Sequence, residues 1–412
     1  MAGWFWLIAW ALWWLIVVLG VKGTSPVMAV IGLLSLPVLL RKRPTFSLDA
    51  IVFLALLVWC VMTSFWSEGA NRGLIIVDLA NENIAIQSPG LRLAFAALVC
   101  TFGYWALHQL PDTMYPRVRW AAVFGMGVVA LIVCVAAASL DLLMQVGLSI
   151  SNAENLDGNL LRSLNLVILS VPVFVLTLKL RDSRIAVGLG VILFGVLGYL
   201  AYRLGGTAAM LSIPAIGVMA GLVWLFGRHI FRLLGVLTAV LIMLMPVGVD
   251  TFLSNVDTDD LPSSSLSRVY AYEYVGDKIE QKWLTGWGVE ASKTWKENVP
   301  TPIVGPNGQL VSDFPVVPGH PHNMSLQVWA ETGLIGALLL SAFALLLGER
   351  LYQTGSDRTS VQIAGASLWA GAIVHGLVSY SVWNDVFWGG LLFLATGILV
   401  ATRTDRAKGK MS

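Results

Sequence analysis

Two histidines lie where the longest polar stretch of the chain meets an apolar segment. The segment reads His320-Pro321-His322-Asn323, and Gly333 and Gly336 follow it. An imidazole exchanges protons near neutral pH, so it can serve as a base where water meets a membrane. His322 is therefore the first candidate for a catalytic residue, and Asn323 is a candidate for substrate binding. The alternative is a histidine that only caps the following helix.

Arginines near the same expected face could bind an anionic substrate. Arg203 ends an apolar run, and Arg268 opens an expected helix in the polar stretch. Guanidinium groups form paired hydrogen bonds with phosphate oxygens, so two arginines beside a proton-accepting histidine suit a diphosphate. The alternatives are an Arg203 that only reaches toward the headgroups and an Arg268 paired with Glu273 or Asp277. Weaker candidates for substrate binding are Arg72, Arg92, Arg162 and Trp287.

Motifs for nucleotides and metals are missing from the sequence. It has no Gly-rich nucleotide-binding loop, no dinucleotide fingerprint and no carboxylate cluster at the end of an apolar run. His320 and His322 could touch one metal ion, but no second pair of ligands lies nearby. We expect an enzyme without metal, nucleotide or other cofactor. The net charge of +2, with scattered basic residues, argues against a nucleic-acid partner.

The composition predicts an all-α polytopic membrane protein that contacts membrane lipids. Only 12% of the residues are charged and 57% are hydrophobic, whereas soluble domains carry about 25% charged residues. Seventeen tryptophans, several in the first apolar run, suggest an aromatic belt at the membrane interface. By the length needed to cross the hydrocarbon core, about twelve spans are expected. They are 4–20, 25–40, 49–66, 91–107, 119–140, 161–178, 185–202, 207–226, 230–249, 326–347, 360–381 and 384–401.

Basic residues mark every second loop, as in Arg41-Lys42-Arg43 after the second span. Positive loops stay in the cytoplasm, so we expect both termini there and the long polar stretch on the opposite face. The expected organisation is 1–249 with spans one to nine, 250–325 as a large extramembrane loop, and 326–412 with spans ten to twelve and a short tail. No cleaved signal peptide is expected, because no basic region precedes the first run.

The loop at 250–325 has recognisable parts. Aromatic and aliphatic residues at helical spacing predict a helix over 267–283, with Ser267 as its N-cap. Thr285-Gly286-Trp287-Gly288 reads as a glycine-rich turn, and six prolines exclude a helix over 298–321.

The motif His322-Asn323-x9-Gly333-x-x-Gly336 resembles that of the O-antigen ligase and O-antigen polymerase superfamily. Ser267-Arg268, the turn at 283–288 and the Ser64-Phe65-Trp66-Ser67 end of the third span add to the likeness. The resemblance is carried by residues 200–340, and the twelve-span layout extends it to the whole chain.

This resemblance implies a GT-C-type glycosyltransferase in the bacterial inner membrane with its active site facing the periplasm. The donor would be O-antigen on undecaprenyl diphosphate and the acceptor lipid A–core, with direct, inverting transfer. The family's catalytic histidine and arginines match His322, Arg268 and Arg203, although Leu204-Gly205-Gly206 departs from the expected pattern.

Other activities remain open at this point. An O-antigen or other polysaccharide polymerase and a protein O-oligosaccharyltransferase belong to the same superfamily. A secondary transporter or flippase fits the number of spans, but the candidate residues gather at one face rather than at the membrane midplane. A structural scaffold is a further alternative.

Overall fold

The computed structural model describes residues 2–41, 46–68, 75–78, 83–86, 88–140, 153–178, 183–255, 261, 263–299, 303–304, 310–311 and 314–409. Arg72 and the Lys42-Arg43 pair lie outside these residues, so their predicted roles stay predictions.

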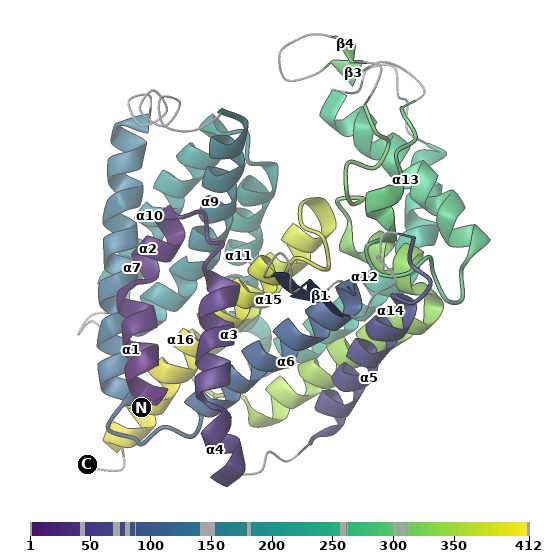
Figure 1. The fold of residues 1–412 in the computed structure, drawn as a ribbon. Coiled ribbons are helices and arrows are strands. Elements are labelled where there is room, and N and C mark those ends of the chain that lie inside the picture. Colours follow the sequence, from purple (N-terminus) through teal and green to yellow (C-terminus); the bar gives the residue numbers. More distant parts are fainter. Residues whose placement is uncertain are drawn as a thin grey trace.

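Helices dominate the described residues (Figure 1). They are α1 (Ala2–Ala11), α2 (Trp13–Val18), α3 (Thr24–Leu34), α4 (Leu36–Arg41), α5 (Leu48–Thr63), α6 (Pro89–Leu107), α7 (Tyr115–Ala138), α9 (Ala153–Leu178), α10 (Ser183–Arg203), α11 (Thr207–Phe226), η1 (Gly227–His229), α12 (Ile230–Leu253), α13 (Ser263–Gln281), η2 (Ala291–Thr294), α14 (Met324–Thr354), α15 (Thr359–Val378) and α16 (Asp385–Gly409).

Two short antiparallel hairpins accompany the helices. Strand β1 (Ile75–Asp78) pairs with β2 (Asn83–Ile86), so that Ile75 faces Ile86. Strand β3 (Ile303–Val304) pairs with β4 (Leu310–Val311) beyond α13, at the edge of the molecule (Figure 1). Neither hairpin forms a larger sheet in the described part of the chain.

The chain is an α-helical, multi-pass membrane protein. Eight segments among the described residues are long and apolar enough to cross a bilayer, and one of them, Thr207–Leu253, holds α11 and α12 joined at η1. Two further apolar helices, Thr24–Val38 and Leu48–Thr63, are shorter. The expected first span is interrupted between α1 and α2, and the second between α3 and α4. The count of twelve spans therefore stays a prediction.

Three of the N-terminal tryptophans form core instead of an interfacial belt. Trp6, Trp10 and Trp13 are fully buried, and the rings of Trp10 and Trp13 lie 4.3 and 4.8 Å from that of Phe393 in α16. The Trp10 indole N–H donates to Thr396 Oγ1 at 3.1 Å, so its polar atom is satisfied inside the bundle. The prediction of a belt was wrong for these residues, because their run packs against a distant helix.

A buried arginine joins several helices at the end of the bundle where α7 begins. Arg119 donates to the Thr177 carbonyl at the end of α9 and forms an ion pair with Asp405 in α16 at 3.0 Å. Arg358, just before α15, also pairs with Asp405. These contacts gather residues near several predicted cytoplasmic loops at one end of the helices, and the first residues of α1 lie near that end as well (Figure 1).

Candidate active site

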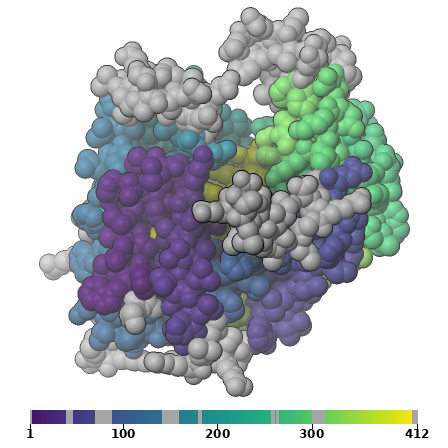
Figure 2. Space-filling view, in the orientation of Figure 1, coloured from purple at the N-terminus to yellow at the C-terminus, as the bar shows by residue number. Residues whose placement is uncertain are grey.

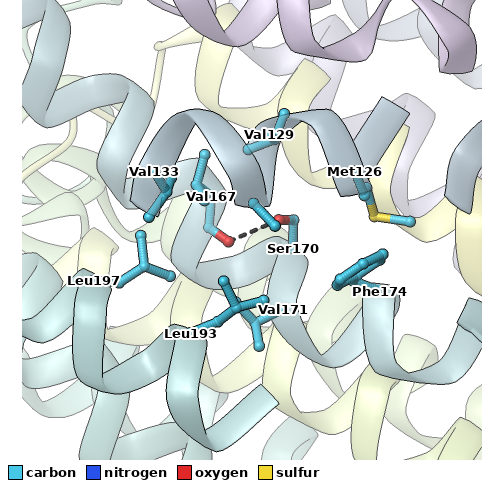
Figure 3. A pocket seen from close by; sticks show the side chains of 10 residues that line it. Met126, Val129, Val133, Val167, Ser170, Val171, Phe174, Leu193 and Leu197 are labelled. Atoms are coloured by element: carbon cyan, nitrogen blue, oxygen red, sulfur yellow. Dashed lines mark hydrogen bonds between the residues drawn. The ribbon is translucent and has the colours of Figure 1, made fainter. Parts of the chain in front are cut away.

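Two of the cavities among the described helices differ greatly in size. The smaller lies between α7, α9 and α10 and has a volume of about 10 Å³. Figure 3 shows its walls of valine, leucine, Met126 and Phe174, where the one hydroxyl, on Ser170, already donates to the Val167 carbonyl at 2.7 Å. It has neither the room nor the polar groups for a substrate.

The larger cavity has a volume of about 600 Å³ and a polar lining. It lies where α2 ends, where α6 and α16 begin and where α15 has just ended, and C-terminal residues are visible at the floor of the hollow in Figure 2. This volume is in the range of ligand pockets. Its charged and histidine residues are Lys22, Arg92, Arg162, Glu290, Lys293, His320 and Asp385.

The cavity carries an excess of positive charge. Four cationic side chains line it against two carboxylates, and His320 is the titratable ring among them. Arg92 and Arg162, two of the weaker sequence candidates, thus share one cavity although 70 residues separate them in the chain. Such a lining favours an anionic ligand.

The two histidines of the motif lie together, and one carbonyl fixes both. Their ring centroids are 4.3 Å apart, and the Ser379 carbonyl oxygen lies 3.1 Å from His322 Nδ1 and 3.0 Å from His320 Nε2. A carbonyl only accepts, so each of these nitrogens carries a hydrogen. In the neutral ring the opposite nitrogen of His322, Nε2, therefore has the free lone pair. His322 itself adopts a left-handed backbone with φ of 55°, which is typical of functional positions.

Burial keeps both rings neutral at physiological pH. The pKa of His322 is lowered to about 4. Burial is the main cause, and the neighbouring His320 and Arg268 contribute to the same shift. The pKa of His320 is lowered mainly by burial and also by Lys293. Cations therefore flank the pair on two sides, with Arg268 near His322 and Lys293 near His320. His322 does not line the large cavity itself, whereas His320 does.

Arg268 lies beside the histidine motif, in α13. Among the described residues neither Glu273 nor Asp277 pairs with it, so the alternative of a loop ion pair is not supported. On the next turn of α13, burial raises the pKa of Tyr272, while the nearby Arg268 and the Asn323 side chain lower it. Asn323 caps α14, because its Oδ1 accepts from the Leu326 amide at 3.1 Å. Asn323 thus fixes the start of α14 directly after His322.

One prediction about the loop helix is wrong, whereas the site roles of Arg203 and Trp287 stay predictions. Ser267 is not the N-cap of the loop helix, because α13 begins four residues earlier, at Ser263, in a run of serines that hides the boundary. Arg203 is exposed, donates to the Tyr199 hydroxyl at 2.8 Å and is not in the lining of the large cavity. Trp287 also lies outside that lining, and its indole N–H donates to the Lys278 carbonyl at 2.8 Å.

The first glycine of the motif breaks α14 and lets a turn insert. Gly333 has φ 66° and ψ −167°, which interrupts the helix. The Ala330 and Glu331 carbonyls accept from the Trp287 and Gly288 amides at 2.9 and 2.8 Å, and the Leu334 amide donates to the Trp283 carbonyl at 2.8 Å. The turn at 283–288 is therefore joined to α14 by backbone hydrogen bonds, eight residues or more after His322.

A buried glutamate ties the turn and the cavity wall to the same helix. Glu331 in α14 accepts from the Glu290 amide at 2.5 Å, from Ser292 Oγ at 2.6 Å and from Gln327 Nε2 at 3.1 Å, and the indole N–H of Trp383 also donates to it. Glu331 is fully buried, and a carboxylate in that position needs such donors. Two of the segments it holds, at Glu290 and Trp383, line the large cavity.

Sequence reasoning missed several of these residues. Lys22, Glu290, Lys293 and Asp385 carry no local motif, and only the fold brings them to one cavity. Glu331 had a signal, since a carboxylate lies inside an apolar run two residues before Gly333. Ionisable residues at such positions are rare and are often functional.

Residues 189–341 match the family described as O-antigen ligase. This stretch contains Arg203, Arg268 and the histidine motif. A "Putative polysaccharide ligase" from Rickettsia felis is 30% identical over 126 residues, which are 30% of this chain and 29% of that protein. A second "Putative polysaccharide ligase", from Rickettsia prowazekii, is 24% identical over 201 residues, 47% of each chain. The chain thus matches less than half the length of these relatives. No solved structure matches.

Proposed function

We propose that this chain, whose residues 189–341 match the O-antigen ligase family, transfers a polysaccharide from undecaprenyl diphosphate to lipid A–core. The observation that carries the proposal is the pair of neutral, carbonyl-fixed histidines between Arg268 and a cationic cavity. The acceptor and the carrier are taken from the resemblance of the motif, and a polymerase or a protein O-oligosaccharyltransferase is the alternative within the same superfamily.

In the proposed reaction His322 is the base. Its Nε2 lone pair takes the proton of the acceptor hydroxyl while the hydroxyl oxygen attacks the anomeric carbon of the donor sugar. The bond from that carbon to the diphosphate oxygen breaks, and undecaprenyl diphosphate leaves with the bonding electrons. This single displacement inverts the configuration at the anomeric carbon. The hydrogen bond from Nδ1 to the Ser379 carbonyl supports this role, because it fixes the tautomer and the ring.

Positive side chains take the place of a metal ion in this proposal. Arg268 and Arg203 bind the diphosphate, and their guanidinium groups stabilise the negative charge that develops on the leaving group. Support for Arg268 comes from its position beside His322, and support for Arg203 comes from the family resemblance and its end-of-helix position. Asn323 is the proposed substrate-binding residue next to His322, and its position is fixed because it caps α14.

The proposed setting is the bacterial inner membrane, with the site at the periplasmic face and both termini in the cytoplasm. In this arrangement residues 250–325 form the periplasmic part of a GT-C-type enzyme, between the spans of 1–249 and 326–412. The polyprenyl chain of the donor would lie in the bilayer beside the helices.

The lipopolysaccharide profile of a strain lacking the protein tests the acceptor. Intact core together with free, polymerised O-antigen on its lipid carrier is expected for a ligase. Core that carries a single repeat unit would instead mean a polymerase.

A second experiment tests the arginines in purified protein. Arg268→Lys and Arg203→Lys keep the charge but lose the paired hydrogen bonds, so each should lose most transfer activity. The effects of the two changes should be non-additive, because both side chains act on one leaving group. A fully active Arg268→Lys variant would remove the proposed diphosphate contact at that position.

A further inference from the structure

A carboxylate bridges two cations at the wall of the large cavity. Glu290 Oε1 lies 2.7 Å from Arg92 Nη2 at the start of α6 and 2.7 Å from Lys293 Nζ in η2. All three residues line the cavity. The Glu290 side chain is only 11% exposed, whereas those of Arg92 and Lys293 are 58% and 56% exposed. The two cations are thus open to the cavity, and the carboxylate lies behind them.

The backbone of Glu290 is held in an uncommon conformation. Its φ of 64° is left-handed, which costs a non-glycine residue free energy that the surroundings must offset. The hydrogen bond from its amide to the buried Glu331 carboxylate fixes this conformation. The left-handed backbone and the fixed amide together place the Glu290 Oε1 atom between Arg92 and Lys293. A surface ion pair does not usually need a backbone held in this way.

The cavity offers more positive charge than Glu290 can balance. Lys22 and Arg162 line it as well, and Asp385 is the one further carboxylate in its lining. An anion that enters will therefore be attracted even while Glu290 stays ionised. Arginine and lysine together are the side chains that most often bind phosphate oxygens in proteins.

We propose that this cavity binds a phosphate group of a lipid-linked substrate between Arg92 and Lys293, and that Glu290 occupies the position of a phosphate oxygen until the substrate arrives. The substrate's lipid-linked nature rests on the proposed function, but the anion site does not. The phosphate has two possible sources, the diphosphate of the donor and a phosphate ester on the headgroup of the acceptor lipid. In both cases the bound phosphate lies beside His320, whose ring is 4.3 Å from that of His322.

Binding of inorganic pyrophosphate and orthophosphate to the purified full-length protein in detergent tests the site without turnover. Glu290→Gln removes the competing charge, so pyrophosphate affinity should rise about tenfold. Arg92→Ala and Lys293→Ala should each weaken binding by roughly 10- to 100-fold, as expected for loss of a charged hydrogen bond. The matched control is Glu349→Gln. The Glu349 carboxylate pairs with Arg232 at 2.6 Å, and neither residue lines the cavity. This control should leave pyrophosphate affinity unchanged.

Weaker or unchanged pyrophosphate binding in a folded Glu290→Gln protein overturns the inference, since a purely structural glutamate would give that result. If Glu290→Gln does not fold, Lys293→Ala carries the test, and unchanged affinity in that variant overturns the inference equally. Transfer by a protein that binds neither anion would reject the anion site and leave the proposed function standing.

Transfer kinetics then separate the two sources. A Lys293→Ala effect on the KM for the lipid-linked donor assigns the phosphate to the donor diphosphate. An effect on the KM for the acceptor lipid assigns it to the acceptor headgroup. Pyrophosphate binding without any transfer activity would reject the proposed function and leave the anion site standing.

Discussion

Replacing Gly333 with alanine should detach the turn at 283–288 from α14 and stop transfer. The φ and ψ of Gly333, 66° and −167°, lie in a region that is open almost only to glycine. An alanine held there carries a strain of about 1–3 kcal/mol. Its added Cβ would lie 2.3 Å from the Leu284 carbonyl oxygen and 2.4 Å from the carbonyl carbon, so the turn has to move away.

The movement also breaks the hydrogen bonds that join the turn to the helix. Three of them, with lengths of 2.8 to 2.9 Å, connect the backbones on the two sides of the break. Each contributes about 0.5–1.5 kcal/mol, so strain and lost bonds together amount to about 2.5–7.5 kcal/mol. This is large for one turn but small enough for the helices to remain folded. We therefore expect an inserted protein whose site is disordered locally.

Two measurements check this expectation. Transfer activity of Gly333→Ala should be lost, and a cysteine at Ala291, which is buried in the folded protein, should become reactive to a thiol reagent in a Cys134→Ala background. Gly276→Ala is the matched control. Gly276 lies inside α13 with no atom within 4 Å of an added Cβ, so alanine there should be neutral or stabilising by about 1 kcal/mol. A Gly333→Ala protein with normal transfer and an unreactive cysteine would refute the reasoning.

Four further expectations concern the base, its titration, metals and topology. His322→Ala should lower transfer about 100- to 10,000-fold with little loss of stability, and near-normal transfer would rule out His322 as the base. Because the pKa of His322 is lowered from 6.5 to about 4, kcat/KM should stay constant as the pH falls from 8 to about 5.5, and an acid limb near 6.5 would contradict this. The unfolded chain takes up that proton near pH 6.5, so the folded protein should lose stability as the pH falls from 6.5 towards 4. Transfer should persist in EDTA, since the sequence has no carboxylate cluster for Mg²⁺, and a reaction restored by one added metal would reveal a missed site. In intact spheroplasts an impermeant thiol reagent should label Lys296→Cys but not Asp357→Cys, both in the Cys134→Ala background, and the reverse pattern would invert the topology.

Local pattern was sufficient for most helices. The expected span at 207–226 is α11, Thr207–Phe226. Inside a membrane, the backbone of a single long apolar run can form all its hydrogen bonds only as a helix. The loop helix was also found, but its start was misplaced, since a run of serines offers several equivalent caps. The break at Gly333 was invisible, because glycine inside an apolar run does not by itself interrupt a helix.

The site was predictable in part, and distance along the chain explains the rest. His322 and Arg268 stood out because a motif and a helix start mark them locally. Lys22 and Lys293 come to the same cavity from opposite parts of the chain, and a lysine at the end of a helix looks the same whether it faces a substrate or water. The tautomer of His322 depends on Ser379, 57 residues away, which no local pattern indicates.

The joint between the turn and α14 bears on how proteins of this kind can diversify. Its hydrogen bonds run from backbone to backbone, so they depend on a glycine at 333 and on the close approach of Gly286 to Glu331, and hardly on the remaining side chains. Side chains on the outer segments can therefore change through evolution while the histidine motif keeps its register. A graft that exchanges residues 296–318 between relatives, leaving 283–295 and α14 intact, should accordingly leave the histidine motif in place.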